Sequence, residues 1–242
     1  NKIRERIKGK DTFNEVQSNH ADLLNHQKAG LLLASRYDKF AFFYDTGTGK
    51  TVMTLSIIKA KQETGARFLI LAPKAIIKSA WCEDMASFFP ELRILPISNN
   101  FNFDDYAKLY RQWERTTKIP AEDVVSEKTW ALATMEIDYS QPDWSEQYDE
   151  RQAARNYIYA CLATMAEHYI VNIEKFRYDP DSIMDYYDIN GLIVDESAIL
   201  KNPNSVSAKT LFEYADQFSY IYLLSGKPAP NNSSEYYAQM KL

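Results

Sequence analysis

The stretch Tyr44-Asp45-Thr46-Gly47-Thr48-Gly49-Lys50-Thr51 is the most informative part of this chain. The apolar run 40–43 precedes it, and a helical pattern at 52–58 follows it. A strand, a glycine-rich turn and a helix in this order are the setting that a phosphate-binding loop requires. Because Gly47 and Gly49 have no Cβ, their backbone can take positive φ angles and wrap closely around an anion. The stretch therefore predicts a phosphate-binding loop between a strand and a helix.

The residue types of this loop fit a nucleoside triphosphate with Mg²⁺. Backbone N–H groups of such a loop and of the following helix N-terminus point at the phosphates. Lys50 would reach the β- and γ-phosphates, and the Thr51 hydroxyl would ligate Mg²⁺. The strict pattern begins with glycine where this chain has Tyr44, so a chance Gly-Lys-Thr in a surface turn is the competing interpretation. The predicted nucleotide-binding residues of the loop are Thr46, Gly47, Thr48, Gly49, Lys50 and Thr51.

Gln27 lies upstream of the loop, in an amphipathic helical pattern at 23–34. A glutamine amide offers both a donor and an acceptor, which suits the edges of adenine. We therefore predict that Gln27 contacts the base of the nucleotide, and an ordinary helix-surface residue is the competing interpretation.

Composition places the chain among ordinary soluble globular proteins. Of its 242 residues, 45% are hydrophobic and 25% are charged, and the formal net charge is −5. If nucleic acid is a partner, the positive surface must therefore be local. Cys82 and Cys161 lack metal-ligand spacing, which favours a reducing, cytoplasmic location. The charged residues 1–6 and the lack of a long apolar run predict neither a secretory signal nor a membrane segment, and the absence of an initial Met suggests a fragment.

Apolar strands alternate with helical patterns along most of the chain, which is typical of an α/β fold. We predict a mostly parallel central sheet flanked by helices. Pro96 lacks an N–H donor and favours the end of a strand or an edge strand. The predicted strands are 40–43, 67–72, 92–97, 169–173, 191–196 and 220–224.

Residues 99–150 interrupt this alternation. Acidic residues outnumber basic ones there, and frequent aromatic residues argue against a disordered tail. We predict a largely helical acidic insertion on the outside of a main domain formed by 20–98 and 151–242, with 1–19 as a lead-in. The insertion could be a spacer, a surface for a protein partner or a regulatory flap, and a plain structural elaboration is the alternative.

Asp195 and Glu196 lie where the predicted strand 191–196 ends, at the sheet edge where α/β proteins bind ligands. One carboxylate can hold Mg²⁺ through water while the other polarises an attacking water. An acid pair at an exposed strand end is the competing interpretation. Together with the upstream loop, the pair predicts a site for nucleotide hydrolysis.

In this order, the motifs resemble the N-terminal motor lobe of superfamily 2 helicases, and most closely that of Swi/Snf-like DNA translocases of phage or bacterial type. The resemblance spans roughly residues 20–98 and 151–242. That family does not keep the first glycine of the loop, which accounts for Tyr44. The matching segments are Leu24-Asn25-His26-Gln27, 45–51, 71–81, Asn172-Ile173-Glu174-Lys175-Phe176, 195–198 with 200–202, and 225–231.

The resemblance implies a RecA-like fold and an ATP hydrolase that uses Mg²⁺ and moves on DNA. It implies that Gln27 contacts adenine, that Asp195 holds the metal through water, and that Glu196 is the catalytic base, acting together with Lys50. The DNA would be double-stranded and bound without sequence specificity, because phosphate contacts carry no sequence information. The residues implied to face the DNA backbone are Lys74, Asn172, Lys201 and Asn202, for which solvated loop positions are the alternative.

Three positions depart from the pattern of the resembled family. Ala198 replaces a His, Lys227 replaces a Thr, and Ile173 replaces a Tyr. The first two predict a changed coupling between the acid pair and the loop after the last strand. The resemblance also implies a second motor lobe that this chain lacks, so the isolated lobe should bind nucleotide weakly and hydrolyse it very slowly.

Three functions therefore stay open. The chain could belong to a DNA translocase, to a nucleotide-gated module that switches a DNA or protein partner with little turnover, or to another phosphate-loop enzyme such as a kinase. The absence of a plausible acceptor site in the sequence argues against the kinase.

Overall fold

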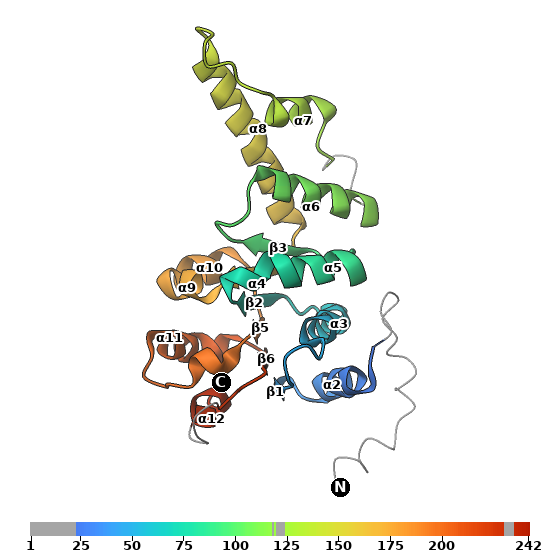
Figure 1. Ribbon diagram of the computed structural model, residues 1–242, viewed down its shortest axis with the longest axis vertical. Coiled ribbons are helices and arrows are strands. Elements are labelled where there is room, and N and C mark those ends of the chain that lie inside the picture. The colour runs from blue at the N-terminus through green and yellow to red at the C-terminus, as the bar shows by residue number, and fades with distance from the viewer. Residues whose placement is uncertain (1–22, 118, 120–123, 230–234) are drawn as a thin grey trace.

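Six parallel strands form one sheet, in the order β1-β6-β5-β2-β4-β3. The computed structural model describes residues 23–117, 119, 124–229 and 235–242, so the predicted lead-in lies outside the described residues. The prediction of an α/β fold with a parallel sheet is confirmed (Figure 1). The strands are β1 (Lys39–Phe43), β2 (Phe68–Ala72), β3 (Ile94–Ile97), β4 (His168–Asn172), β5 (Gly191–Val194) and β6 (Tyr220–Ser225).

The burial of the strands explains their sequences. Every residue of β2 and β5 is buried, because these strands lie inside the sheet and helices cover both of its faces. Strands covered on both faces are continuous apolar runs rather than alternating ones. Pro96 lies in β3 at the edge of the sheet, where a missing donor is tolerated, as its position in the sequence predicted.

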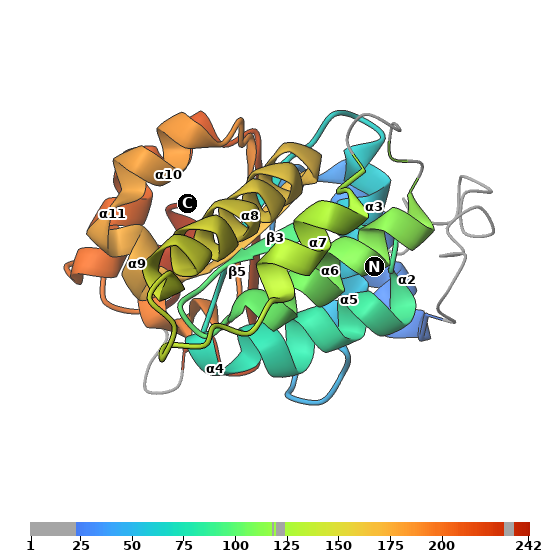
Figure 2. The ribbon, with the colours of Figure 1, turned by 90° about the horizontal axis from the view of Figure 1, so that it is seen from above.

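Helices cover the sheet in two layers. Figures 1 and 2 show α2, α3 and α5 on one face and α9, α10 and α11 on the other. No helix among the described residues is apolar over a length that could span a bilayer. The helices before the insertion are α2 (Asn25–Arg36), α3 (Lys50–Gln62), α4 (Lys74–Ile76), a π-helical turn (Ile77–Cys82) and α5 (Glu83–Phe88). The later ones are α9 (Ile173–Tyr178), α10 (Pro180–Tyr186), the 3₁₀ turn η4 (Ser197–Leu200), α11 (Val206–Tyr214), the 3₁₀ turn η5 (Ala215–Gln217) and α12 (Tyr236–Met240).

The segment between β3 and β4 forms a helical arm, made of α6 (Phe103–Thr116), α7 (Glu127–Thr134) and α8 (Trp144–Met165), which projects beyond the sheet (Figure 1). The predicted boundary at 150–151 falls inside the continuous helix α8. The acidic composition ends near residue 150, but the hydrogen-bonded helix continues through it. Composition therefore did not locate the structural boundary of the arm.

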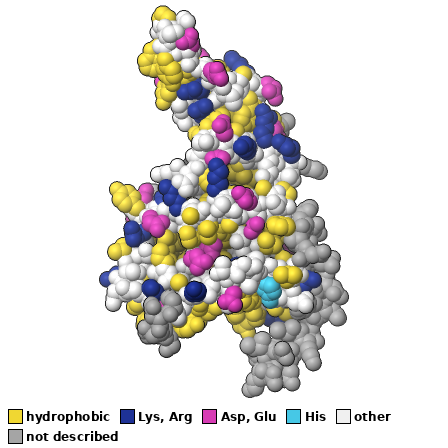
Figure 3. Space-filling model, in the orientation of Figure 1, with side chains coloured by type: hydrophobic (Ala, Val, Ile, Leu, Met, Phe, Trp, Pro, Cys, Tyr) yellow, Lys and Arg dark blue, Asp and Glu magenta, His cyan; other side chains and the backbone are white. Residues whose placement is uncertain are grey.

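The packed side of α8 is narrow and leaves one large aromatic side chain of the helix in solvent. Tyr157 is 49% exposed, whereas Ala154, Ile158, Leu162 and Met165 are buried. These four residues follow helical spacing and form one stripe. Hydrophobic side chains also gather at the free end of the arm (Figure 3), where Tyr139, Trp144 and Tyr148 are exposed.

His168 begins β4 and is completely buried. Its Nδ1 accepts a hydrogen bond from the Phe68 backbone N–H at 3.1 Å. Burial, together with the nearby positive charges of Arg67 and Arg93, lowers the pKa of His168 to about 3. Because this pKa lies below that of the unfolded chain, the histidine contributes stability above about pH 6.5, and this is lost as pH falls towards 3.

We therefore expect the His168→Gln variant to lose less stability in mild acid than the wild type. Glutamine can still accept the bond from Phe68 but does not titrate. Between about pH 6.5 and 5.5, the free energy of unfolding of the wild type should fall by about 1 kcal/mol more than that of the variant. Urea unfolding at the two pH values measures this difference, and parallel pH slopes would contradict it.

Candidate nucleotide and DNA site

All strands of the sheet run parallel, so the segments that follow them lie along one edge, the edge formed by the carboxyl ends of the strands. Three neighbouring strands lead into the predicted nucleotide site: β1 into the phosphate-binding loop, β6 into the 226–229 loop, and β5 into the acid pair. On the other half of this edge, β2 leads into Lys74, β4 ends at Asn172, and β3 leads into the 98–99 segment. The strand order thus places the predicted nucleotide residues on one half of this edge and two predicted DNA residues on the other.

The phosphate-binding loop has the backbone shape of an anion cradle. Gly47 and Gly49 take φ angles of 80° and 73°, in the region that favours glycine. Lys50 begins α3, and its Nζ donates to the carbonyl oxygens of Tyr44 at 3.1 Å and Asp45 at 3.2 Å. The ammonium group is therefore held at the loop, beside the helix N-terminus, where a phosphate would be bound.

Gln27 contacts this loop directly. Its Nε2 donates to the carbonyl oxygens of Thr48 at 3.1 Å and Gly49 at 3.2 Å, and its Oε1 accepts from the Leu24 N–H at 2.8 Å. The side chain is buried, so it is not an ordinary helix-surface residue. In this conformation the amide stabilises the loop, and contact with adenine stays a prediction.

His26 is a second contact from α2 that the sequence analysis did not assign. Its Nε2 lies 2.9 Å from the Thr48 carbonyl oxygen, and its ring meets that of Tyr44 edge-on at 5.7 Å. The Tyr44 hydroxyl donates to the His26 carbonyl oxygen at 3.4 Å. The tyrosine in place of the first glycine therefore packs the loop against α2.

Asp195 is a buried carboxylate with two donors. Its Oδ2 accepts from Trp81 Nε1 at 2.9 Å, and its Oδ1 accepts from the Glu196 N–H at 2.9 Å. Burial raises the pKa of Asp195, while the Trp81 bond and the charge of Lys50 oppose that rise. The positive charge of Lys50 thus acts on the Asp195 carboxylate, which links the phosphate-binding loop electrostatically to the acid pair.

Trp81 reaches Asp195 from the π-helical turn 77–82. This turn lies between α4 and α5 and interrupts the regular α-helical winding of the segment after β2. Such turns often occur at functional sites, because the inserted residue shifts the direction of the side chains that follow. The segment 71–81 was matched to the resembled family, but the partner of Trp81 lies far along the chain and was not predicted.

Glu196 has a φ of 52° and a ψ of 51°, and it is the one described residue other than glycine with positive φ. This conformation costs about 1 kcal/mol for a residue with a Cβ. The turn leaves the Glu196 side chain exposed, while Asp195 beside it is buried. The two acids therefore have the different environments that different roles in hydrolysis require.

The loop after β6 lies against the phosphate-binding loop. A Cβ on Gly226 would come within 3.1 Å of Thr46 Oγ1 and 3.4 Å of the Thr46 backbone nitrogen, so only glycine fits there without a shift. The Lys227 N–H donates to Ser225 Oγ at 3.2 Å, and the Lys227 side chain is exposed. Residues 230 and 231 of this motif lie outside the described residues.

A groove with a volume of about 690 Å³ lies at the other half of the edge. Lys74 and Asn172 both line it, so the structure brings these two predicted DNA residues together. Lys175 and Arg177 of α9 add two positive charges that the sequence analysis did not assign, although Lys175 lies in a matched segment. Lys201 and Asn202 are exposed but are not among the residues that line this groove.

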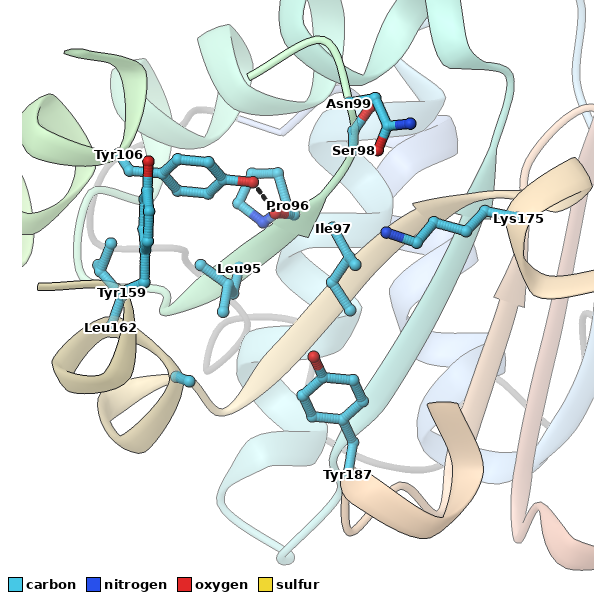
Figure 4. Close-up of a pocket in the computed structure, with 11 residues that line it drawn as sticks. Leu95, Pro96, Ile97, Ser98, Asn99, Tyr106, Tyr159, Leu162, Lys175 and Tyr187 are labelled. Atoms are coloured by element: carbon cyan, nitrogen blue, oxygen red, sulfur yellow. Dashed lines mark hydrogen bonds between the residues drawn. The ribbon is translucent and has the colours of Figure 1, made fainter. Parts of the chain in front are cut away.

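A smaller pocket of about 320 Å³ adjoins the groove, and Asn99 and Lys175 line both (Figure 4). Tyr106, Tyr159 and Tyr187 line its wall, and the Tyr106 hydroxyl donates to the Pro96 carbonyl oxygen at 2.9 Å. Burial raises the pKa of Tyr106 to about 12, so this hydroxyl stays neutral at physiological pH. The pocket is formed where the arm meets the edge of the sheet, which no local sequence pattern predicts.

The Trp81→Phe variant should be less stable by about 1–3 kcal/mol near neutral pH, because the buried Asp195 carboxylate loses a donor. The Trp81 bond lowers the pKa of Asp195, so its removal raises that pKa. Folding then favours the protonated acid more strongly, and the stability deficit shrinks as the pH falls through the raised pKa. Urea unfolding at pH 7.5 and in mild acid measures this change.

Trp113→Phe is the matched control for this prediction. Trp113 is buried in the arm, and its Nε1 has no hydrogen-bond partner among the described residues. The Trp113→Phe variant loses the same side-chain volume, but no acceptor loses its donor. Its loss of stability relative to the wild type should therefore not change with pH. Equal pH dependence of the two variants would contradict the role given to the Trp81 bond.

Comparisons with known proteins agree with this geometry. The family model of the SNF2-related domain matches residues 26–242. The SWI2/SNF2 ATPase core of Sulfolobus solfataricus, solved in complex with dsDNA, is similar in structure, with a TM-score of 0.56 and 16% identity over 92% of this chain and 36% of that one. The UvsW helicase of bacteriophage T4 has a TM-score of 0.58 and 12% identity, over 94% of this chain and 64% of that one.

No curated protein matches the sequence. The two solved structures share the fold, and each is substantially longer than this chain. The family model covers the loop, the acid pair and the arm in one continuous match. The chain belongs to the SNF2-related domain family.

Proposed function

We propose that this chain is the N-terminal ATP-binding lobe of an ATP-dependent DNA translocase, in which hydrolysis drives movement along duplex DNA. The observation that carries the proposal is the shared sheet edge. A phosphate-binding loop with Lys50 and the acid pair 195–196 lies on one half, and a groove with Lys74, Lys175 and Arg177 lies on the other. Family membership supports the same function.

The residues of the loop fit ATP with Mg²⁺, because the positive φ angles of Gly47 and Gly49 form a cradle and Lys50 stands at it. The bound metal would neutralise charge on the phosphates. Thr51, in the first turn of α3, and Asp195 would hold it, with Asp195 acting through water. Glu196 would accept the proton of the attacking water. The nucleotide-binding set would also include Thr46, Thr48 and Gln27.

The groove supports binding to DNA phosphates rather than to bases. Its two lysines and one arginine outnumber its two acids, Glu174 and Asp179, and they are compact or planar cations that phosphate oxygens attract. Asn172 adds an amide, which in this conformation donates to Glu174 Oε2 at 2.9 Å. Lys201 and Asn202 would contact DNA outside this groove. The proposed partner is therefore double-stranded DNA without sequence specificity.

The Lys175→Ala/Arg177→Ala variant should show weaker and less salt-dependent binding to duplex DNA. Each phosphate contact that is lost reduces the slope of log K against log salt by about 1, so the double variant should lose about 2. Titration of labelled duplex at several salt concentrations measures the slope. An unchanged slope would exclude the groove as the DNA contact.

We also propose a second motor lobe in the same polypeptide, because this chain spans only 36% and 64% of the two similar structures. Such a lobe would supply arginines to the transferred phosphoryl group, a contribution of roughly 10³–10⁵ in rate where arginine fingers have been measured. The isolated lobe should then bind ATP weakly and hydrolyse it very slowly.

The free end of the arm is better suited to a protein than to DNA. Its exposed aromatic residues 139, 144 and 148 stand among acids, and no Lys or Arg occurs between Lys128 and Arg151. This charge would repel phosphates and attract a basic protein surface. Asp149→Asn/Glu150→Gln should therefore leave the salt dependence of DNA binding unchanged, which also makes it a control for the groove variant.

ATP hydrolysis by the full-length protein, with and without duplex DNA, tests the proposed function. Strong stimulation by duplex supports the translocase. Nucleotide binding without stimulated turnover would favour a nucleotide-gated switch module, for which Lys227→Thr is the first variant to measure. Phosphate transfer to an acceptor other than water would indicate a different phosphate-loop enzyme.

A further inference from the structure

Gln239 of α12 joins two parts of the site that are distant in sequence. Its side chain is 2% exposed. Ser197 Oγ donates to Gln239 Oε1 at 2.7 Å, and Gln239 Nε2 donates to the carbonyl oxygen of Pro228. Both halves of the amide are therefore bonded, one to the turn after the acid pair and one to the loop after β6.

The burial of this amide makes its two bonds specific. Ser197 is fully buried, so its hydroxyl depends on a protein acceptor. A buried polar group without a partner costs about 1–3 kcal/mol, and an apolar side chain at 239 would leave Ser197 without this acceptor. Gln239 Nε2 also lies 3.4 Å from the Glu235 carbonyl oxygen of its own segment, which restrains the amide orientation.

The first of these bonds acts on the conformation of Glu196. Glu196 precedes Ser197 directly and takes the strained left-handed conformation at the start of η4. Strain of this kind persists where neighbouring contacts enforce it. The neighbouring Ala198 has no side-chain hydrogen-bonding atom, so among the side chains of these two residues the hydroxyl of Ser197 supplies the polar anchor.

The second bond leads to the phosphate-binding loop. Pro228 lies two residues beyond Gly226, and Gly226 stands so close to Thr46 that a Cβ would crowd it. A displacement of the phosphate-binding loop would therefore push on the loop after β6 and, through the Pro228 carbonyl, on Gln239. The close approach of Gly226 to Thr46, the chain from 226 to 228 and the two Gln239 hydrogen bonds thus link Thr46 with the turn that carries Glu196.

We propose that Gln239 is a positioning residue that couples the loop after β6 to the orientation of Glu196. This role rests on the proposed ATPase function of the same site. Gln239 contacts neither of the predicted phosphate-binding elements directly, so it should influence the hydrolytic step and not the affinity for nucleotide. In this chain, which has Ala198 and Lys227 where the resembled family has His and Thr, Ser197 and Gln239 would then connect the turn after the acid pair with the loop after β6.

A double-mutant cycle in the full-length protein tests this proposal. The variants are Gln239→Met, Ser197→Ala and the two combined, with Gln147→Met in α8 as the control for the same exchange away from the site. Each is measured for the Kd of a fluorescent ATP analogue, for kcat with and without duplex DNA, and for thermal unfolding. Ser197→Ala removes only an oxygen, so it keeps the test valid if Gln239→Met folds poorly.

We expect kcat to fall about 10-fold or more in each single variant, with the nucleotide Kd changed by no more than about twofold. The double variant should be no slower than the worse single variant, because both break one connection. Fully additive losses, an unchanged kcat, or a kcat that falls only in proportion to the folded fraction would overturn the proposal. If the wild type lacks DNA-stimulated turnover, the proposed function fails, and the same cycle is then decided on basal kcat.

Discussion

Lys50→Ala should lower ATP turnover by the full-length protein by at least about 100-fold, the cost that is typical of removing one hydrogen-bond donor that stabilises a transition state. The Lys50 ammonium lies 3.1 Å and 3.2 Å from two carbonyl oxygens of its own loop, beside the N-terminus of α3. Binding of a triphosphate would transfer this charge from neutral carbonyls to phosphate oxygens. A charge-assisted hydrogen bond is about twice as strong as a neutral one, so alanine forfeits a large interaction.

The measurement is steady-state ATP hydrolysis with duplex DNA, together with the Kd of a nucleotide analogue. Lys61→Ala is the matched control, since Lys61 lies at the other end of α3 and pairs with Asp38 at 2.8 Å. The control should retain wild-type turnover within about twofold. Comparable turnover of Lys50→Ala and the wild type would exclude the loop as the hydrolytic site.

Glu196→Gln should reduce kcat by about 10²–10⁴, the range of general acid–base catalysis, and leave nucleotide binding intact. The exposed Glu196 carboxylate stands next to the buried Asp195, which has a raised pKa. Glutamine keeps the size of the side chain and the backbone conformation, but it cannot accept a proton. The free energy of unfolding should therefore be close to that of the wild type.

Single-turnover hydrolysis with prebound ATP isolates this step from binding. Glu213→Gln, on the exposed side of α11, is the control for the same loss of charge. A Glu196→Gln variant with wild-type single-turnover rates would show that another group activates the water. A variant that instead loses nucleotide affinity would place Glu196 in binding and not in proton transfer.

Most secondary structure of this protein could be predicted from local sequence patterns. The buried runs of β2 and β5 and the glycines of the phosphate-binding loop impose their conformation through side-chain periodicity and φ preference. The edge position of Pro96 follows in the same way from its missing donor. The π turn at 77–82 and the continuity of α8 across residue 150 did not follow, since tertiary packing can override helix preference and composition does not mark where a helix begins or ends.

The residue types of the site were thus readable from the chain, but their partners were not. Trp81 bonds Asp195, Gln239 bonds Ser197, and Lys175 lines the same groove as Lys74. These pairs form because β5 lies between β6 and β2 in the sheet, and β4 lies on the other side of β2. Strand order depends on how helices pack over the whole sheet, and nothing within a single strand specifies its neighbour. Local sequence therefore determined which chemical groups this edge carries, and the tertiary fold determined which of them touch.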